Sequence, residues 1–149
     1  MPEKKTIERA RRDKKEGKRP STQAGEFVRE EMEHIREGEH GARSPQQAIA
    51  IGLSKARRAG VKLPPPKRGK ASARTRKQAK RDVKRGGARR KKPSRTRSRA
   101  TKRALKREKR SAASRKALSR QARSAARRRS ARSRSAAAKK AARTRKRRR

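Results

Sequence analysis

The sequence predicts a protein that is mostly α-helical and disordered, with a small αα-hairpin head followed by a low-complexity cationic tail. The chain of 149 residues holds 56 Lys and Arg against 12 Asp and Glu, which gives a net charge of +44. Only 26% of its residues are hydrophobic, and Phe27 is the single aromatic residue. Such a chain buries too little surface to offset the entropy of ordering over most of its length. Apolar residues recur at helical spacing mainly in residues 21–63.

The charge divides the sequence at Pro64. Residues 1–63 carry 16 basic and 10 acidic residues, whereas residues 64–149 carry 40 basic residues and only two acidic ones, Asp82 and Glu108. Pro64 and the two prolines after it form a stiff, extended segment that ends any preceding helix. We therefore expect three parts: a basic N-terminal segment with a frayed helix (1–20), the αα-hairpin head (21–63), and a tail that is disordered or conditionally helical (64–149).

The first hairpin helix is predicted to follow Pro20. Ser21 or Thr22 supplies an N-terminal cap, and Gly38 ends the helix. The apolar residues recur at steps of three and four and therefore form one stripe. Its members are Ala24, Phe27, Val28, Met32 and Ile35.

The second hairpin helix has clear signals at both ends. Ser44 is placed to cap it, Pro45 suits the first helical position, and Gln47 is the partner of a capping box. Gly60 can take the left-handed conformation that ends a helix, with Val61 folding back onto the last turn. Its stripe consists of Ala48, Ile49, Gly52, Leu53 and Ala56. The short connection predicts an antiparallel αα-hairpin.

Two helices of this size bury too little surface to be stable alone. We therefore expect the apolar stripe to meet the N-terminal segment, a second copy in a homo-dimer, or a partner protein. The predicted interface residues are Phe27, Val28, Met32, Ile35, Ile49 and Leu53.

The tail has the composition of a phosphate-binding segment. Its Ala, Leu, Arg and Lys are good helix formers, but like-charge repulsion opposes helices in water, so we expect disorder alone and helices on a polyanion. Arg outnumbers Lys by 26 to 14, and guanidinium suits phosphate. The tail has no aromatic residue on which bases could stack, so binding rests on the backbone and reads no sequence. The predicted DNA-binding residues are Arg74, Arg76, Lys80, Arg81, Arg89, Arg90, Lys91, Lys92, Arg103, Arg107, Arg110, Arg127, Arg128, Arg129, Arg147, Arg148 and Arg149.

Other kinds of site find little support. Without cysteine there are no disulfides or thiolate sites, and no catalytic constellation or substrate-sized pocket is indicated, so we expect no enzyme and no cofactor. The basic residues Lys55, Arg57 and Arg58 lie at the wrong end of the second hairpin helix for helix-turn-helix readout of bases. The stretch EEMEHIREGEH lacks the HExxH pattern and a third histidine, so we expect no metal there but a solvated acidic face, or one that restrains the tail. Its titratable residues are Glu30, Glu31, Glu33, His34, Glu37, Glu39 and His40.

The N-terminal sequence has no apolar core of a secretory signal, and no window approaches the roughly 18 apolar residues of a membrane span. We expect a cytoplasmic protein on the nucleoid. The cationic segments also have too few bulky apolar residues to insert into a membrane surface.

The stretches STQAGEFVREE (21–31), HGARS (40–44) and AIAIGLSKARRAGV (48–61) resemble a bacterial family of small basic proteins of unknown function. Members are sometimes labelled DNA-binding or plasmid-stabilisation proteins. The resemblance covers residues 3–66 closely and extends to 103–122, but it implies no activity or catalytic residue. The Ala/Lys/Arg/Ser tail is similar to linker-histone and bacterial histone-like tails, which implies nucleoid association.

These observations predict nonspecific binding of double-stranded DNA by phosphate neutralisation, with the head dimerising or recruiting a partner. One alternative is an RNA- or ribosome-associated basic protein, because charge alone does not distinguish the two nucleic acids. The other is a protein-binding adaptor that its cationic tail localises.

Overall fold

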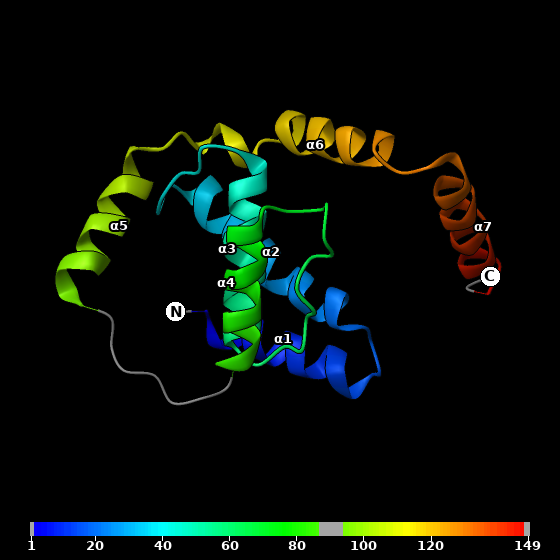
Figure 1. Ribbon diagram of the computed structural model, residues 1–149, viewed down its shortest axis with the longest axis horizontal. Helices are drawn as coiled ribbons and strands as arrows, with labels where there is room; N and C mark the ends of the chain where they lie inside the picture. The colour runs from blue at the N-terminus through cyan, green and yellow to red at the C-terminus, as the bar shows by residue number, and fades with distance from the viewer. Residues whose placement is uncertain (1, 87–93, 148–149) are drawn as a thin grey trace. The chain divides into compact units, whose positions relative to one another are not determined.

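The computed structural model describes residues 2–86 and 94–147, except the side chain of Arg147, and these residues form helices and connecting loops without a strand (Figure 1). The chain divides into two compact units, Met1–Ser114 and Arg115–Arg149. The helices are α1 (Lys4–Lys15), α2 (Pro20–Glu37), α3 (Pro45–Arg58), α4 (Ala73–Lys84), α5 (Arg95–Arg107), the 3-10 helix η1 (Arg110–Ala113), α6 (Arg115–Arg127) and α7 (Ala131–Arg147).

The prediction of a small head with a disordered tail is wrong, because α4 to α7 all lie beyond Pro64. The helix propensity of Ala, Arg and Lys exceeds the like-charge repulsion there. A serine stands directly before each of the four helices. Ser72 and Ser130 are caps: Ser72 Oγ accepts a hydrogen bond from the Thr75 N–H at 3.1 Å, and Ser130 Oγ accepts one from the Ser133 N–H at 3.2 Å. Such caps are each worth about 1 kcal/mol. Ser94 makes no such bond at the start of α5, and Ser114 stands directly before α6.

Helix α2 ends where the sequence predicts but begins differently. Gly38 has a left-handed φ of 86°, and its N–H donates to the His34 carbonyl at 3.1 Å. The predicted side-chain cap is wrong, because Arg19 occupies the cap position and makes no such bond. Pro20 starts the helix instead, since its ring holds φ near the helical value and its missing N–H is not needed there.

Both predicted ends of α3 are confirmed. Ser44 Oγ accepts from the Gln47 N–H at 3.2 Å, and Gln47 Oε1 accepts from the Arg43 N–H at 2.7 Å, one residue before the expected partner. Gly60 has φ of 96°, and the Val61 N–H donates to the Ala56 carbonyl at 3.1 Å. This bond turns Val61 back onto the last turn, as a Schellman motif does.

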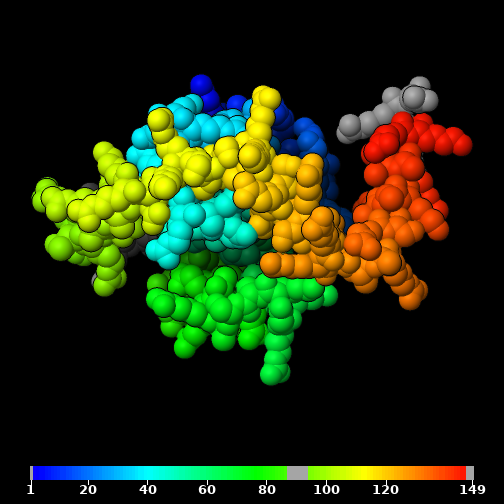
Figure 2. Space-filling view, turned by 90° about the horizontal axis from the view of Figure 1, so that it is seen from above, coloured from blue at the N-terminus to red at the C-terminus, as the bar shows by residue number. Residues whose placement is uncertain are grey.

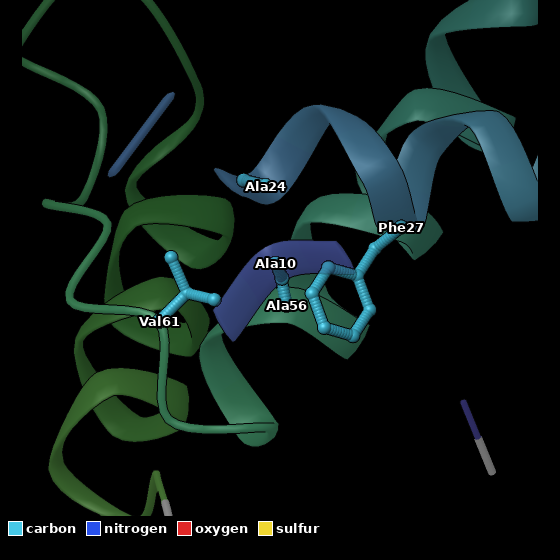
Figure 3. Packing of buried hydrophobic residues seen from close by; sticks show 5 residues of the cluster. All are labelled: Ala10, Ala24, Phe27, Ala56 and Val61. Carbon is cyan, nitrogen blue, oxygen red and sulfur yellow. The ribbon is translucent and has the colours of Figure 1, made fainter. Parts of the chain in front are cut away.

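The core of the first unit lies where α1, α2 and the end of α3 meet (Figure 3). Phe27 is 1% exposed and is surrounded by small or branched residues. Because Ala10 is 5% exposed and belongs to this cluster, α1 packs on the hairpin and is not a frayed segment. The cluster consists of Ala10, Ala24, Phe27, Ala56 and Val61, with Ile7, Leu53 and Leu63 packed against it.

The backbones of α2 and α3 approach closely at Gly52. A Cβ atom at this position would lie 2.7 Å from Val28 Cα and 3.0 Å from the Phe27 carbonyl oxygen. Real Cβ atoms do not come this close to backbone atoms, so only glycine fits there. The packing of α2 against α3 in the middle of the hairpin therefore depends on the absence of a side chain at position 52.

A segment far beyond Pro64 returns to the hairpin. The Gly41 N–H donates to the Leu105 carbonyl at 2.9 Å, and the Ala42 N–H donates to the Lys109 carbonyl at 3.2 Å. In η1, Ala112 and Ala113 are buried against α2 and α3. The first unit therefore includes part of what composition assigns to a tail, because two alanines and a few backbone groups suffice to dock it.

The close approach at Gly52 predicts a large effect of a single methyl group. We expect Gly52→Ala to lower the free energy of unfolding by about 1–3 kcal/mol, because the added Cβ overpacks the α2–α3 contact. The matched control is Gly25→Ala in α2, where a Cβ meets nothing within 4 Å. That change should stabilise by about 0.5–1 kcal/mol, as alanine does in a helix interior. Urea unfolding measures both, and equal effects would contradict the packing argument.

Candidate nucleic-acid interface

Helix α4 is held on α3 by a buried carboxylate. Asp82 is 5% exposed; its Oδ2 accepts from Ser54 Oγ at 2.7 Å, and its Oδ1 accepts from Gln78 Nε2 at 3.1 Å. Ala79, one turn earlier, is 4% exposed and lies on the same side. These residues fix which side of α4 faces α3, so the opposite side faces outward.

Arg57 holds the segment that leads from α3 to α4. Its side chain is buried, with Nε donating to the Leu63 carbonyl at 3.2 Å and Nη2 donating to the Pro64 carbonyl at 3.3 Å. Burial lowers the pKa of the Arg57 guanidinium, and the charge of Asp82 opposes this shift. Arg57 therefore stabilises the backbone at the start of the proline segment and does not face a nucleic acid.

Helix α4 lies at the surface of the first unit (Figure 2, green), and its outward side carries a row of cations. Arg74, Lys77, Arg81 and Lys84 recur at steps of three and four, so they share one face, and all four are exposed. Lys80 is also exposed at the edge of this row, whereas Arg76 is half-buried toward the packed side. Lys77 and Lys84 are missing from the sequence-based prediction, although the three-and-four spacing identifies them once α4 is known to be a helix.

Helix α5 exposes most of its surface. None of its residues, all of which the structure describes, is buried, and Arg103 and Arg107 are exposed. Directly after the helix, the Glu108 carboxylate lies 3.7 Å from Arg43 Nε of the hairpin loop. The second acidic residue of the C-terminal 86 residues is thus already paired within the first unit.

In the second unit, α6 gathers its cations on one stripe. Lys116, Arg120, Arg123 and Arg127 follow at steps of four, three and four, so they lie above one another on the helix surface. At a rise of about 1.5 Å per residue the stripe is about 17 Å long. Only Arg127 is among the predicted residues. The other three could have been found by testing the cations, and not only the apolar residues, for helical spacing.

Helix α7 distributes its cations differently. Arg132 and Arg143 lie on one side, whereas Arg134 and Arg145 lie on the opposite side, and all four are exposed. Residues 115–149 contain 17 Arg and Lys and no acidic residue. The cations of this unit therefore have no acidic side chain of their own unit to pair with.

The predicted DNA-binding residues fall into three groups. Nine are exposed: Arg74, Lys80, Arg81, Arg103, Arg107, Arg110, Arg127, Arg128 and Arg129. Arg76 is half-buried. Outside the described residues lie Arg89, Arg90, Lys91, Lys92, Arg148, Arg149 and the side chain of Arg147.

Half of the predicted interface residues lie inside the first unit. Phe27, Met32 and Ile35 are 1%, 6% and 0% exposed, so they pack within the chain itself. The remaining three are partly exposed: Val28, Ile49 and Leu53. Their role in a dimer or partner interface stays a prediction.

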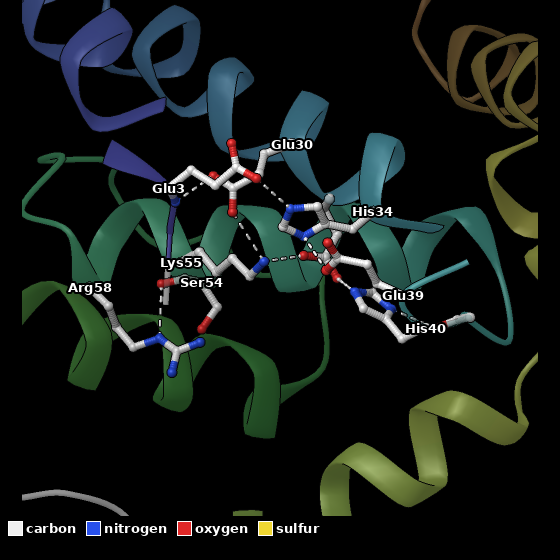
Figure 4. A network of polar contacts seen from close by, with 10 residues as sticks. Glu3, Glu30, His34, Glu39, His40, Ser54, Lys55 and Arg58 are labelled. Atoms are coloured by element: carbon white, nitrogen blue, oxygen red, sulfur yellow. Dashed lines mark hydrogen bonds and ion pairs between the residues drawn. The ribbon is translucent and has the colours of Figure 1, made fainter. Parts of the chain in front are cut away.

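The Glu- and His-rich end of α2 is largely a buried polar network (Figure 4). Glu30 and Glu31 are 3% and 0% exposed, and Lys55 of α3 pairs with both, with Nζ 3.3 Å from Glu30 Oε1 and 2.6 Å from Glu31 Oε2. A solvated acidic face is therefore a wrong description of these two residues, although Glu37 is exposed. The reason is that Lys55 sits opposite them once α2 and α3 pair.

Residues 19–68 match a family described as "Family of unknown function (DUF6496)". The match covers α2, α3 and the proline segment, and it confirms the resemblance to an uncharacterised family over that part of the chain. No curated protein and no solved structure matches the sequence. Among the residues that the structure describes, no helix has both the length and the apolar character that crossing a membrane requires.

The contacts of Asp82 predict how α4 can be released. We expect Asp82→Ala to lower amide-exchange protection across residues 73–84 at least tenfold, because a buried hydrogen-bonded carboxylate is worth about 1.5–3 kcal/mol. The matched control is Lys77→Ala on the outward side of the same helix. Hydrogen exchange read by mass spectrometry compares them, and equal protection in the two variants would show that α4 is held in some other way.

Proposed function

We propose that this protein binds double-stranded DNA without sequence preference, by neutralising backbone phosphates, as a nucleoid-associated or histone-like protein of a bacterial cytoplasm. It acts through charge and not through catalysis. The observation that carries the proposal is that α4 and α5 of the first unit and α6 and α7 of the second expose cations, while the two carboxylates of residues 64–149 are already engaged. Asp82 is bonded to Ser54 and Gln78, and Glu108 lies against Arg43.

The arrangement of the cations supports contact with a regular array of phosphates. Helix α4 holds four exposed cations in one row on a folded unit, and α6 holds four in one stripe. Duplex DNA carries one charge per roughly 1.7 Å, so a stripe of about 17 Å lies opposite about ten charges. Arginine and lysine at such sites release counterions from the phosphates, and this term is the same for every base sequence.

The alternatives differ in how much the structure supports them. An RNA duplex offers the same phosphate chemistry, so it enters the test below as a second ligand. The adaptor hypothesis depends on an apolar face that is free to bind a partner, and three of its six predicted residues, Phe27, Met32 and Ile35, are buried within the first unit.

The proposal predicts a steep dependence on salt. If about ten phosphates are engaged, the logarithm of affinity should fall against the logarithm of salt concentration with a slope near −9. Fluorescence anisotropy of the full chain with random-sequence DNA, one fixed-sequence DNA and an RNA duplex, from about 50 to 300 mM salt, measures this. Affinities for the two DNAs should agree within a few-fold. A shallow slope or a strong preference for one DNA would overturn the proposal, and much tighter RNA binding would favour the RNA alternative.

The stripe on α6 predicts that position matters as well as charge. The test variant combines Lys116→Gln, Arg120→Gln, Arg123→Gln and Arg127→Gln. The charge-matched control combines Arg132→Gln, Arg134→Gln, Arg143→Gln and Arg145→Gln on α7, which removes two cations from each of two opposite sides.

Each phosphate contact contributes about 0.9 to the salt slope. We expect the α6 variant to flatten the slope by about 3.6, because one face meets the duplex with all four cations. The α7 control should flatten it by about 1.8, since only one side of a straight helix faces the duplex. Equal changes would mean that the number of charges, and not their alignment, determines binding.

A further inference from the structure

The two histidines of the chain lie close together at the end of α2 and are not used by the cationic surfaces. His34 and His40 have ring centroids 6.3 Å apart and meet edge to face. Ligand atoms of Glu31, His34 and His40 all lie within 4.8 Å of one another. Glu31 is 0% exposed, and neither of its carboxylate oxygens accepts a hydrogen bond of good geometry. A buried carboxylate therefore faces two imidazole rings.

The hydrogen bonds of His40 fix which ring nitrogen is available. Its Nδ1 lies 3.1 Å from the Gly41 carbonyl oxygen, which can only accept, so Nδ1 carries the hydrogen. In the neutral ring, Nε2 then carries no hydrogen and has a lone pair. Yet Nε2 lies 3.3 Å from Glu31 Oε1, which also has only lone pairs to offer. Two acceptors at this distance require a cation or a proton between them.

His34 repeats this arrangement. Its Nε2 lies 3.0 Å from the Glu3 carboxylate, which accepts the hydrogen. The other nitrogen, Nδ1, lies 3.6 Å from Glu39 Oε2, so again two acceptors face each other. In both rings, one nitrogen thus donates its hydrogen to a carboxylate or carbonyl oxygen, and the other nitrogen has a lone pair. Metal-binding histidines have this outer shell, which fixes the tautomer and the ring orientation.

We propose that Glu31, His34 and His40 bind a divalent transition-metal ion of the zinc class, with Glu39 as the fourth ligand. Zinc–ligand bonds of about 2.0–2.2 Å place the ligand atoms of a tetrahedral site about 3.4 Å apart. The 3.3 Å between His40 Nε2 and Glu31 Oε1 and the 3.6 Å between His34 Nδ1 and Glu39 Oε2 have this spacing, and the ligand atoms of Glu31, His34 and His40, which lie within 4.8 Å of one another, would draw closer together around the ion. Two imidazole ligands favour zinc over magnesium or calcium, which prefer oxygen.

The local charge also favours a dication. Four carboxylates gather at the network, from Glu3, Glu30, Glu31 and Glu39, and Lys55 supplies one positive charge. Lys55 Nζ contacts Glu31 through Oε2, so Oε1 is left on the side of His40. A metal there would join the end of α2 to the loop after it, and Lys55 and Glu3 would link this site to α3 and to the N-terminus. The ion is a structural one in this proposal, separate from phosphate binding.

The test uses the untagged full chain, whose two histidines and absence of cysteine leave few competing ligands. Zinc chloride is titrated in a non-chelating buffer and followed by calorimetry and by ¹⁵N NMR of the imidazole rings. We expect one high-affinity ion per chain, with the resonances of His34 Nδ1 and His40 Nε2 shifted and those of the other two nitrogens almost unchanged. This measurement on the wild-type chain needs no variant to fold.

Variants then assign the ligands. We expect Glu31→Gln, His34→Gln and His40→Gln each to weaken zinc binding at least 100-fold, and Glu3→Gln to weaken it about 10- to 100-fold through the ring of His34. The matched control is Glu33→Gln on the same helix, whose carboxylate pairs with Arg29 instead, and it should leave the affinity unchanged. Absence of a high-affinity ion, coordination through the other ring nitrogens, or an equal loss in the control would overturn the proposal. So would NMR evidence that both rings are doubly protonated near pH 7 and unaffected by zinc, because protons would then fill the two contacts.

Discussion

The close approach of α2 and α3 at Gly52 is the constraint on which the rest of the first unit depends. With no side chain at this position, the α3 backbone lies directly against Val28 and the Phe27 carbonyl. This close approach fixes the register of α3 along α2, so that Lys55 contacts the buried carboxylates of Glu30 and Glu31. Removing one partner of such a buried pair costs about 3–5 kcal/mol, so the pair strongly disfavours any other register.

The same register determines which cations reach the surface. Ser54, beside Lys55, bonds to Asp82 and so holds α4, while Arg57 holds the segment before it. Ser54, Lys55 and Arg57, which lie within one turn of α3, therefore all stabilise the packing of the first unit. As a consequence, the row of cations on α4 faces outward. Four acidic residues of the first unit are buried, Asp13, Glu30, Glu31 and Asp82, whereas Arg57 is the one buried Arg or Lys among the residues that the structure describes. The positive surface thus follows from how the few carboxylates are used and not only from the number of cations.

What the sequence predicts well is local, and what it misses depends on contacts between distant segments. Ser44, Pro45 and Gly60 act within a turn or two of the chain, so the ends of α3 could be predicted. The docking of α4 rests on one carboxylate, Asp82, in a stretch whose charge and composition otherwise resemble disorder. The buried state of Glu31 likewise depends on Lys55, which is 24 positions away in the sequence. The serines before the tail helices were a local signal that could have been used, since a hydroxyl one residue before a run of good helix formers is a common start.

The stripe on α6 shows how folding and binding support each other in the second unit. Its cations form three neighbouring pairs at steps of three or four, and each like-charge pair costs about 0.2–0.5 kcal/mol. The helix therefore carries about 1 kcal/mol of repulsion along one face, which its alanines and its leucine offset by propensity. A polyanion placed against that face replaces the repulsion with attraction and thereby stabilises the helix. By the same linkage, the formed helix holds its cations aligned before the polyanion arrives, so less conformational entropy is lost on binding than for a disordered tail of equal charge.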